Sequence, residues 1–144
     1  MSFTQIGPDI NGEAAGDGSG HRVSLSSDGS ILAIGAAGND PSGHTRIYAW
    51  NGTAWVQRGD DIDGEAAGDS SGGSVSLSSD GSTVAIGAYG GLGSQTGYTR
   101  IYAWNGSAWV KRGNDIDGEE QGNRSGWSVS LSSDGSIVAI GAPF

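Results

Sequence analysis

Short apolar runs alternate with glycine-rich polar turns along the whole chain, and this pattern predicts β-strands rather than helices. In one stretch the runs are VSLSS (75–79), TVAIGA (83–88), TRIYAW (99–104) and AWVKRG (108–113). They are short and rich in β-branched and aromatic residues, a composition typical of strands. The turns between them contain Asp80-Gly81 and Asn105-Gly106, dipeptides that favour tight antiparallel hairpins. No segment of ten residues or more carries a helical period.

The same four runs recur at a nearly fixed interval. The motif SLSSDGS begins at Ser24, Ser76 and Ser130, so the copies are 52 and 54 residues apart. A period of this size marks a solenoid, a propeller or an array of repeats. Four antiparallel strands in about 50 residues predict a β-propeller blade, and strand 83–88, apolar on both faces, fits a strand covered on both sides. A β-solenoid is the alternative, although its shorter coils would not need two hairpin turns.

The repeats divide one all-β domain, residues 1–144, into four parts. Residues 1–9 are expected to be the outer strand of a shared blade, 10–61 the first repeat, 62–115 the second and 116–144 a partial third. This division predicts eleven strands, because the third strand of a blade occurs only twice. Since propellers close with about four to eight blades, we expect either a homo-oligomer that completes the ring or a longer array.

The last copy, SGWSVSLSSDGSIVAIGAPF (125–144), resembles the FG-GAP repeat of integrin-α-like β-propellers. The resemblance lies in the SG-aromatic-SV opening, the apolar strand and the ending Gly141-Ala142-Pro143. It implies a propeller used for adhesion or ligand binding, at the cell surface or outside the cell, often with calcium. The family's calcium loop lies between the first two strands, where this chain has only SSDGS, so calcium is not expected at that position.

The acidic residues predict a different cation site. Of the 16 acidic residues, only Asp28, Asp80 and Asp134 lie in turns between the first and second strands. The others fall in connections that alternate strand direction places on the opposite face. Oxygen ligands crowd these connections as around a hard cation, and the candidate ligands are Asp9, Asn11, Glu13, Asp17, Asp61, Asp63, Glu65, Asp69, Asp115, Asp117 and Glu119.

The acidic connections also have a purely structural interpretation. Asp61 and Asp63 would cap backbone amides in a tight turn, Ile62 would fill the core, and Arg58 or Arg100 would pair with the acids. The tryptophan pairs Trp50/Trp55 and Trp104/Trp109 flank their Asn-Gly turns, where they would pack across strands or, in a lectin, stack on sugars.

Positions that differ between the copies are the candidates for ligand contact. The loops 37–44 and 89–98 vary most, and loops on a common scaffold commonly carry binding residues. The candidate ligand-binding residues are His21, Tyr89, Tyr98 and Trp127.

Charge and composition exclude several classes of function. The net charge of −9 argues against nucleic acid, and no apolar run approaches the ~20 residues that span a membrane. The two histidines do not recur between copies and accompany no nucleophile–base pattern, so no enzyme is expected. We therefore expect a non-enzymatic binding or adhesion module that uses its acidic face for a protein or glycan partner. A lectin using the tryptophan hairpins and a structural, self-assembling propeller fragment are the alternatives.

Overall fold

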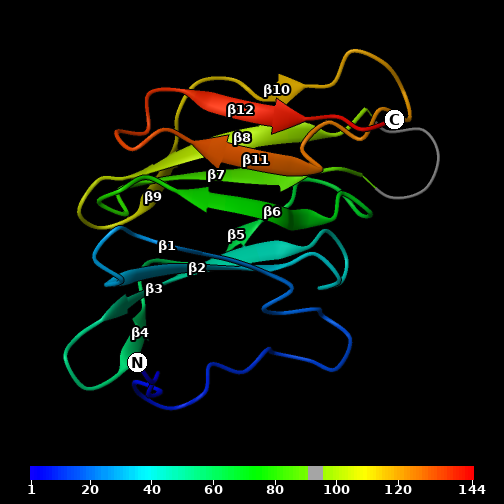
Figure 1. Ribbon diagram of the computed structural model, residues 1–144. Coiled ribbons are helices and arrows are strands. Elements are labelled where there is room, and N and C mark those ends of the chain that lie inside the picture. Colours follow the sequence, from blue (N-terminus) through cyan, green and yellow to red (C-terminus); the bar gives the residue numbers. More distant parts are fainter. Residues whose placement is uncertain (91–95) are drawn as a thin grey trace.

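A computed structural model describes residues 1–90 and 96–144 (Figure 1). The fold is all-β: the described residues form antiparallel sheets and include no helix. None of these residues belongs to a helix long and apolar enough to cross a membrane. The predicted antiparallel, strand-only architecture is therefore confirmed.

The first sheet holds five strands, four from the first repeat and a short one, β5, from the start of the second. Its strands run in the order β1-β2-β3-β4, and β5 joins the free end of the same β3 edge that pairs with β4. Their bounds are β1 (Arg22–Leu25), β2 (Ile31–Ala36), β3 (His44–Trp50), β4 (Trp55–Gln57) and β5 (Ile62–Asp63).

The second sheet repeats this arrangement, and the third contains its first two strands. The second runs β6-β7-β8-β9, with β10 on β8. Its bounds are β6 (Ser71–Leu77), β7 (Thr83–Ala88), β8 (Tyr98–Trp104), β9 (Trp109–Lys111) and β10 (Ile116–Asp117). The third sheet is the hairpin of β11 (Ser128–Leu131) and β12 (Val138–Gly141).

The predicted strands agree with the observed ones to within a few residues. Run 83–88 is β7 itself, whereas β6 begins at Ser71 because a register shift between Ser71 and Ser74 extends its pairing. The turn glycine Gly81 has φ of 69°, a conformation that glycine adopts without steric cost.

The ends of the predicted repeats differ in two ways from the strands that the single chain forms. Residues 1–9 form no strand within the single chain, and Phe3 is 97% exposed. In a blade shared between copies, the neighbouring strand that accepts its hydrogen bonds would belong to a second copy, so this part of the division stays a prediction. The short strands β5 and β10 were not predicted, because two residues carry too little pattern to detect.

The three sheets pack face to face, and the core lies between them (Figure 1). Ile47 and Val84 are fully buried there, and Ile62 is buried as predicted. The backbones approach closely where small residues meet: a Cβ on Gly35 would overlap the carbonyl oxygen of Gly72 in the next sheet. Glycine at this position therefore sets the spacing of the first two sheets.

Candidate functional site

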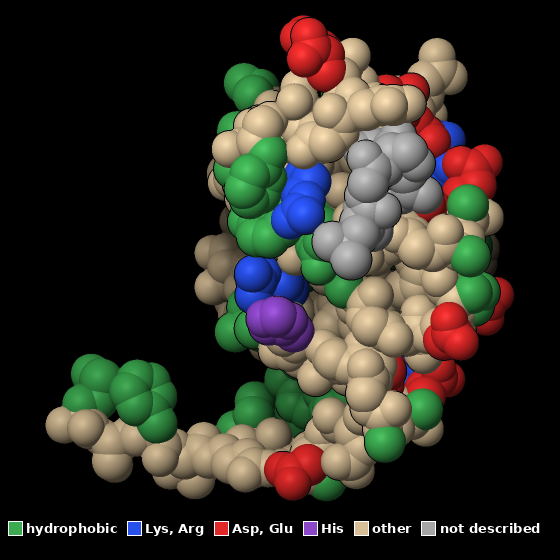
Figure 2. All heavy atoms as spheres, turned by 90° about the vertical axis from the view of Figure 1, so that its right-hand side faces the viewer, with side chains coloured by type: hydrophobic (Ala, Val, Ile, Leu, Met, Phe, Trp, Pro, Cys, Tyr) green, Lys and Arg blue, Asp and Glu red, His purple; other side chains and the backbone are tan. Residues whose placement is uncertain are grey.

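The face that carries the inter-repeat connections is chemically divided (Figure 2). Toward one edge, a histidine side chain lies beside Lys or Arg side chains and hydrophobic side chains. Many of the acidic side chains in view lie along the opposite edge. A candidate ligand site and the predicted acidic surface therefore occupy different parts of the same face.

The candidate site is a cavity of about 300 Å³ between successive repeats. The first repeat contributes from the start of β1 and the end of β2, the second from β6 and the end of β7, and the third contributes one side chain that precedes β11. Its lining residues are His21, Arg22, Ala37, Gly72, Gly73, Tyr89 and Trp127. Three of the four predicted ligand-binding residues, His21, Tyr89 and Trp127, are thus brought together.

The cavity exists because corresponding positions of the repeats differ. Trp127 packs on Tyr89 with ring centroids 4.9 Å apart, and the equivalent of Trp127 in the second repeat is Gly73. A Cβ on Gly73 would overlap the Tyr89 ring. Because Gly73 has no side chain, the Tyr89 ring can pack directly on the backbone of β6, and an opening remains beside His21.

Positive charge borders this opening. Arg22 is exposed and donates a hydrogen bond to the His21 carbonyl at 3.0 Å. Arg124 lies with its guanidinium carbon 5.7 Å from the Trp127 ring centroid and 4.8 Å from that of Phe144. Among the described residues, neither arginine forms an ion pair. The site thus combines cationic donors with an aromatic wall.

Tyr98, the fourth predicted ligand-binding residue, lies elsewhere and has a structural contact. Its hydroxyl donates to the Asp69 carboxylate at 2.7 Å. Burial and this hydrogen bond raise the pKa of the Tyr98 hydroxyl well above its usual value. The tyrosine therefore ties β8 to the connection that precedes β6.

Buried carboxylates organise the predicted metal loops. Asp69 accepts hydrogen bonds from the backbone NH groups of Glu65 at 3.0 Å and Ala66 at 2.9 Å. Asp17 does the same in the first repeat, with the amides of Glu13 and Ser19 both at 2.9 Å. Capping was expected of Asp61 and Asp63. Asp17 and Asp69 cap the first two loops instead, and each is the last acid of its loop and the only buried one there.

Two arginines form ion pairs with other acidic residues of these loops. Arg46 pairs with Glu13 and Asp61, and Arg100 pairs with Glu65 and Asp115. The expected pairing of Arg100 with acids is confirmed. The alternative, Arg58, forms no ion pair among the described residues, and its guanidinium carbon lies 4.8 Å from the ring centroid of Trp104.

One group in these loops has metal-ligand spacing. Glu13, His44 and Asp61 offer ligand atoms within 4.8 Å of one another, but Arg46 already pairs with both carboxylates. The other candidate ligands are exposed, and Asp9 accepts a hydrogen bond from Gln5 at 2.8 Å. These exposed candidates are Asp9, Asn11, Asp63, Asp117 and Glu119. Calcium binding in the loops stays a prediction.

The Arg100–Asp115 pair should make stability depend on pH. Hydrogen bonding to Arg100 and Lys111 lowers the pKa of Asp115 to about 2. A lowered pKa contributes stability that is full above the unfolded pKa of about 4 and is lost as pH falls toward 2. We expect this pair to account for about 2 kcal/mol across that interval.

The measurement is urea unfolding at a series of pH values for the wild type and Arg100→Gln. The wild-type curve should fall more steeply between pH 4 and 2 than the variant's. Arg112→Gln, which changes an exposed arginine without an ion pair among the described residues, is the control. Parallel curves for wild type and Arg100→Gln would contradict the assignment.

The tryptophan hairpins are packed. Trp50 and Trp55 lie with centroids 5.4 Å apart, as do Trp104 and Trp109. The Trp109 indole NH donates to the Arg58 carbonyl of the preceding repeat at 2.8 Å. The packing interpretation is therefore confirmed for these residues.

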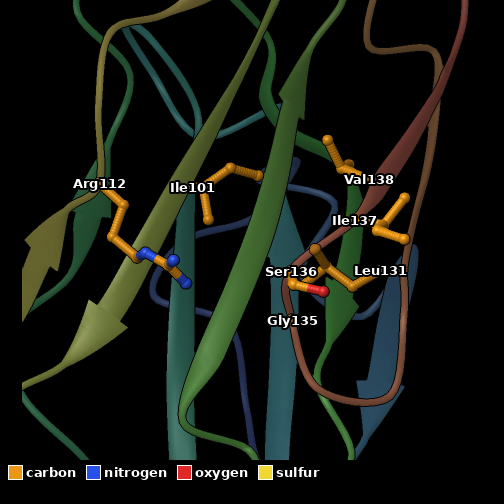
Figure 3. A pocket seen from close by; sticks show the side chains of 7 residues that line it. All are labelled: Ile101, Arg112, Leu131, Gly135, Ser136, Ile137 and Val138. Atoms are coloured by element: carbon orange, nitrogen blue, oxygen red, sulfur yellow. The ribbon is translucent and has the colours of Figure 1, made fainter.

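A second cavity, of about 150 Å³, lies beside β12 (Figure 3). Ile101 lies on one side of it, and Leu131, Ile137 and Val138 of the last hairpin lie on the other. The corresponding residue of the first sheet, Ile47, is fully buried in the core cluster that contains Leu77 and Val84 of the second sheet. The second sheet has a third strand, β8, whereas the third sheet has only two strands among the described residues. This second cavity is a gap in sheet packing rather than a ligand site.

Of the two variable loops, residues 91–95 lie outside the described residues, so only the ends of loop 89–98 can be placed.

No family model and no curated protein matches the chain. Among solved structures, the chain is similar to Kuenenia stuttgartiensis hydrazine synthase, with a TM-score of 0.55 and 10% sequence identity. The alignment covers 96% of this chain and 32% of that one. At this identity the likeness supports the fold alone.

Proposed function

We propose that the chain is a non-catalytic β-propeller binding module that holds an acidic sugar, of the uronic acid type, in the cavity lined by His21, Arg22, Tyr89 and Trp127. The observation that carries the proposal is the convergence of three repeats on this one opening. Two of the side chains there are aromatic and two are nitrogen donors, in a chain whose net charge is −9.

The chemistry of the lining supports a ligand with a flat face and a carboxylate. Trp127 is 38% exposed and offers part of its ring to the cavity. Arg22 and His21 can donate hydrogen bonds to a carboxylate, and bonds from a charged donor are about twice as strong as neutral ones. A volume of about 300 Å³ fits a small ligand.

The repeat geometry supports propeller blades. Each of the first two sheets contains the four antiparallel strands of a blade, and successive sheets stack face to face through their first two strands. The short β5 and β10 lie in the crossings from one repeat to the next.

The acidic surface has weaker support as the principal binding site. Four of its carboxylates already have partners within the chain. Loop amides donate hydrogen bonds to Asp17 and Asp69, and arginines pair with Asp61 and Asp115. The integrin-like resemblance remains the reason to propose an adhesive role at the cell surface, and calcium belongs to that same proposal.

The proposal is tested by titrating the protein with glucuronate while its indole NH signals are followed by NMR. For a monosaccharide of about a dozen non-hydrogen atoms we expect a dissociation constant of about 1 mM. Arg22→Ser and Trp127→Gly should each weaken binding at least tenfold. Both place at their position a residue found at the equivalent position of another repeat, Ser74 and Gly73, so they should fold.

Glucose and acetate separate the two parts of the recognition. Each should bind more weakly than glucuronate, because glucose lacks the carboxylate and acetate lacks the ring. Trp50→Ala is the matched aromatic control, since its ring packs on Trp55 away from the cavity. No saturable shift with glucuronate, or equal loss in Trp50→Ala, would refute the proposed site.

A further inference from the structure

We infer that the outer face of the β11–β12 hairpin docks the β1–β2 face of a second copy of this chain, head to tail. The basis is an interface that occurs twice within the chain, between the first and second sheets and between the second and third. One side of this interface is exposed on the outer face of the first sheet, and the complementary side is exposed on the outer face of the third sheet. The inference does not depend on the sugar site.

Hydrogen bonds define the repeated interface. The amide of Leu77 donates to the Ser24 hydroxyl at 3.0 Å, and one repeat later the amide of Leu131 donates to Ser76 at 2.9 Å. The amide of Ser27 likewise donates to the Ser79 carbonyl at 2.8 Å, and Ser79 donates to Ser133 at 2.8 Å. The next members of the two series would be Ser130 with Leu25, and Ser133 with Ser27, of a second copy.

Steric contacts repeat in the same way. A Cβ on Gly81 would lie 2.6 Å from the Ile31 Cβ, and one on Gly135 would lie 2.9 Å from the Thr83 Cβ, so each turn glycine covers the first residue of the preceding sheet's second strand. Ile137 on the third sheet corresponds to Ile31 and Thr83, and Gly29 on the first sheet corresponds to Gly81 and Gly135. Within the chain neither has such a partner: a Cβ on Gly29 would have no atom within 4 Å.

Exposure distinguishes the covered halves from the open ones. Leu77 is 7% exposed within the chain, whereas Leu25, its equivalent on the first sheet, is 57% exposed. Ile31 is 8% exposed, whereas Ile137, its equivalent on the third sheet, is 69% exposed. A second copy would bury both apolar side chains against surfaces shaped like those that already cover Leu77 and Ile31.

The contact is heterologous, because it joins two different faces. Each docked pair therefore retains one free face of each kind, which leads to a closed ring or to a longer head-to-tail assembly. Sedimentation equilibrium should accordingly give wild-type protein a mass of at least twice 14.4 kDa. A folded wild-type chain that remains at 14.4 kDa at high micromolar concentration would overturn the inference.

Two charge substitutions test the proposed faces. Leu25→Asp and Ile137→Asp should each reduce wild-type assembly strongly, and circular dichroism should show both folded because both positions are exposed. Leu25→Asp retains an intact β11–β12 face, and Ile137→Asp retains an intact β1–β2 face. An equimolar mixture of the two variants should therefore recover a dimer.

Val56→Asp is the control, because Val56 is exposed on β4, outside the proposed contact. It should assemble like the wild type. If Val56→Asp disrupts assembly as strongly as Leu25→Asp, or if the mixture of the two face variants stays monomeric, the head-to-tail contact is wrong.

Discussion

Replacing Gly87 by alanine should lower the free energy of unfolding by about 3 kcal/mol, at the upper end of what overpacking costs in a protein core. Gly87 lies on β7, where the second sheet meets the third. A Cβ there would overlap the carbonyl oxygen of Gly126 and lie 2.9 Å from its carbonyl carbon. Because the obstacle is backbone, no side-chain rotation relieves it, and the two sheets must separate.

Gly141→Ala is the matched control, since Gly141 occupies the same position of the third sheet. The nearest atom to its Cβ would be the Ser128 hydroxyl oxygen at 2.3 Å, which can rotate away, and the next nearest atoms lie at 3.6 Å or more. Thermal and urea unfolding of dilute protein should show a fall in melting temperature of roughly 10 °C for Gly87→Ala and a much smaller one for Gly141→Ala. Equal shifts would mean that the sheet spacing is not set by Gly87.

Most of the fold could be predicted because its signals are local. Strand 83–88 is a short apolar run between turn residues, and Asp80-Gly81 specifies the hairpin that precedes it. Because the sequence repeats, a strand or turn predicted in one copy is also predicted at the equivalent residues of the other copies. Residues 1–9, which the repeat predicts to be the outer strand of a shared blade, form no strand within the single chain, because a strand also needs a neighbour.

The candidate site could be predicted only in part. His21 and Trp127 were singled out because the repeats differ at those positions, and both line the cavity. Arg22 was missed, although it stands where the other repeats have Ser74 and Ser128, and that difference was the available signal. Which acid caps a loop could not be read from spacing, because it depends on which carboxylate becomes buried.

Replacing Asp69 by alanine should have the second large effect, a loss of about 3 kcal/mol. Asp69 is 4% exposed and accepts hydrogen bonds from two backbone amides and from the Tyr98 hydroxyl. Removing the carboxylate leaves these three donors without their acceptor, and a buried donor that loses its partner costs about 1–3 kcal/mol. Because Glu65 and Ala66 are exposed and water can partly replace the carboxylate there, we expect the total to stay near ~3 kcal/mol. The loop before β6 would then lose the contact that ties it to β8.

The variant Tyr98→Phe separates the stability contributed by the Tyr98 hydroxyl from the stability contributed by the backbone amides. It removes one of the three donors and keeps the aromatic ring, so it should cost about 1 kcal/mol. In the double variant Asp69→Ala/Tyr98→Phe the two losses should be less than additive by about 1 kcal/mol, because both single changes break the same hydrogen bond. Urea unfolding of the four proteins at neutral pH provides the cycle. If Asp69→Ala costs no more than Tyr98→Phe, the backbone amides do not depend on the carboxylate, and the loops are held chiefly by their arginine pairs.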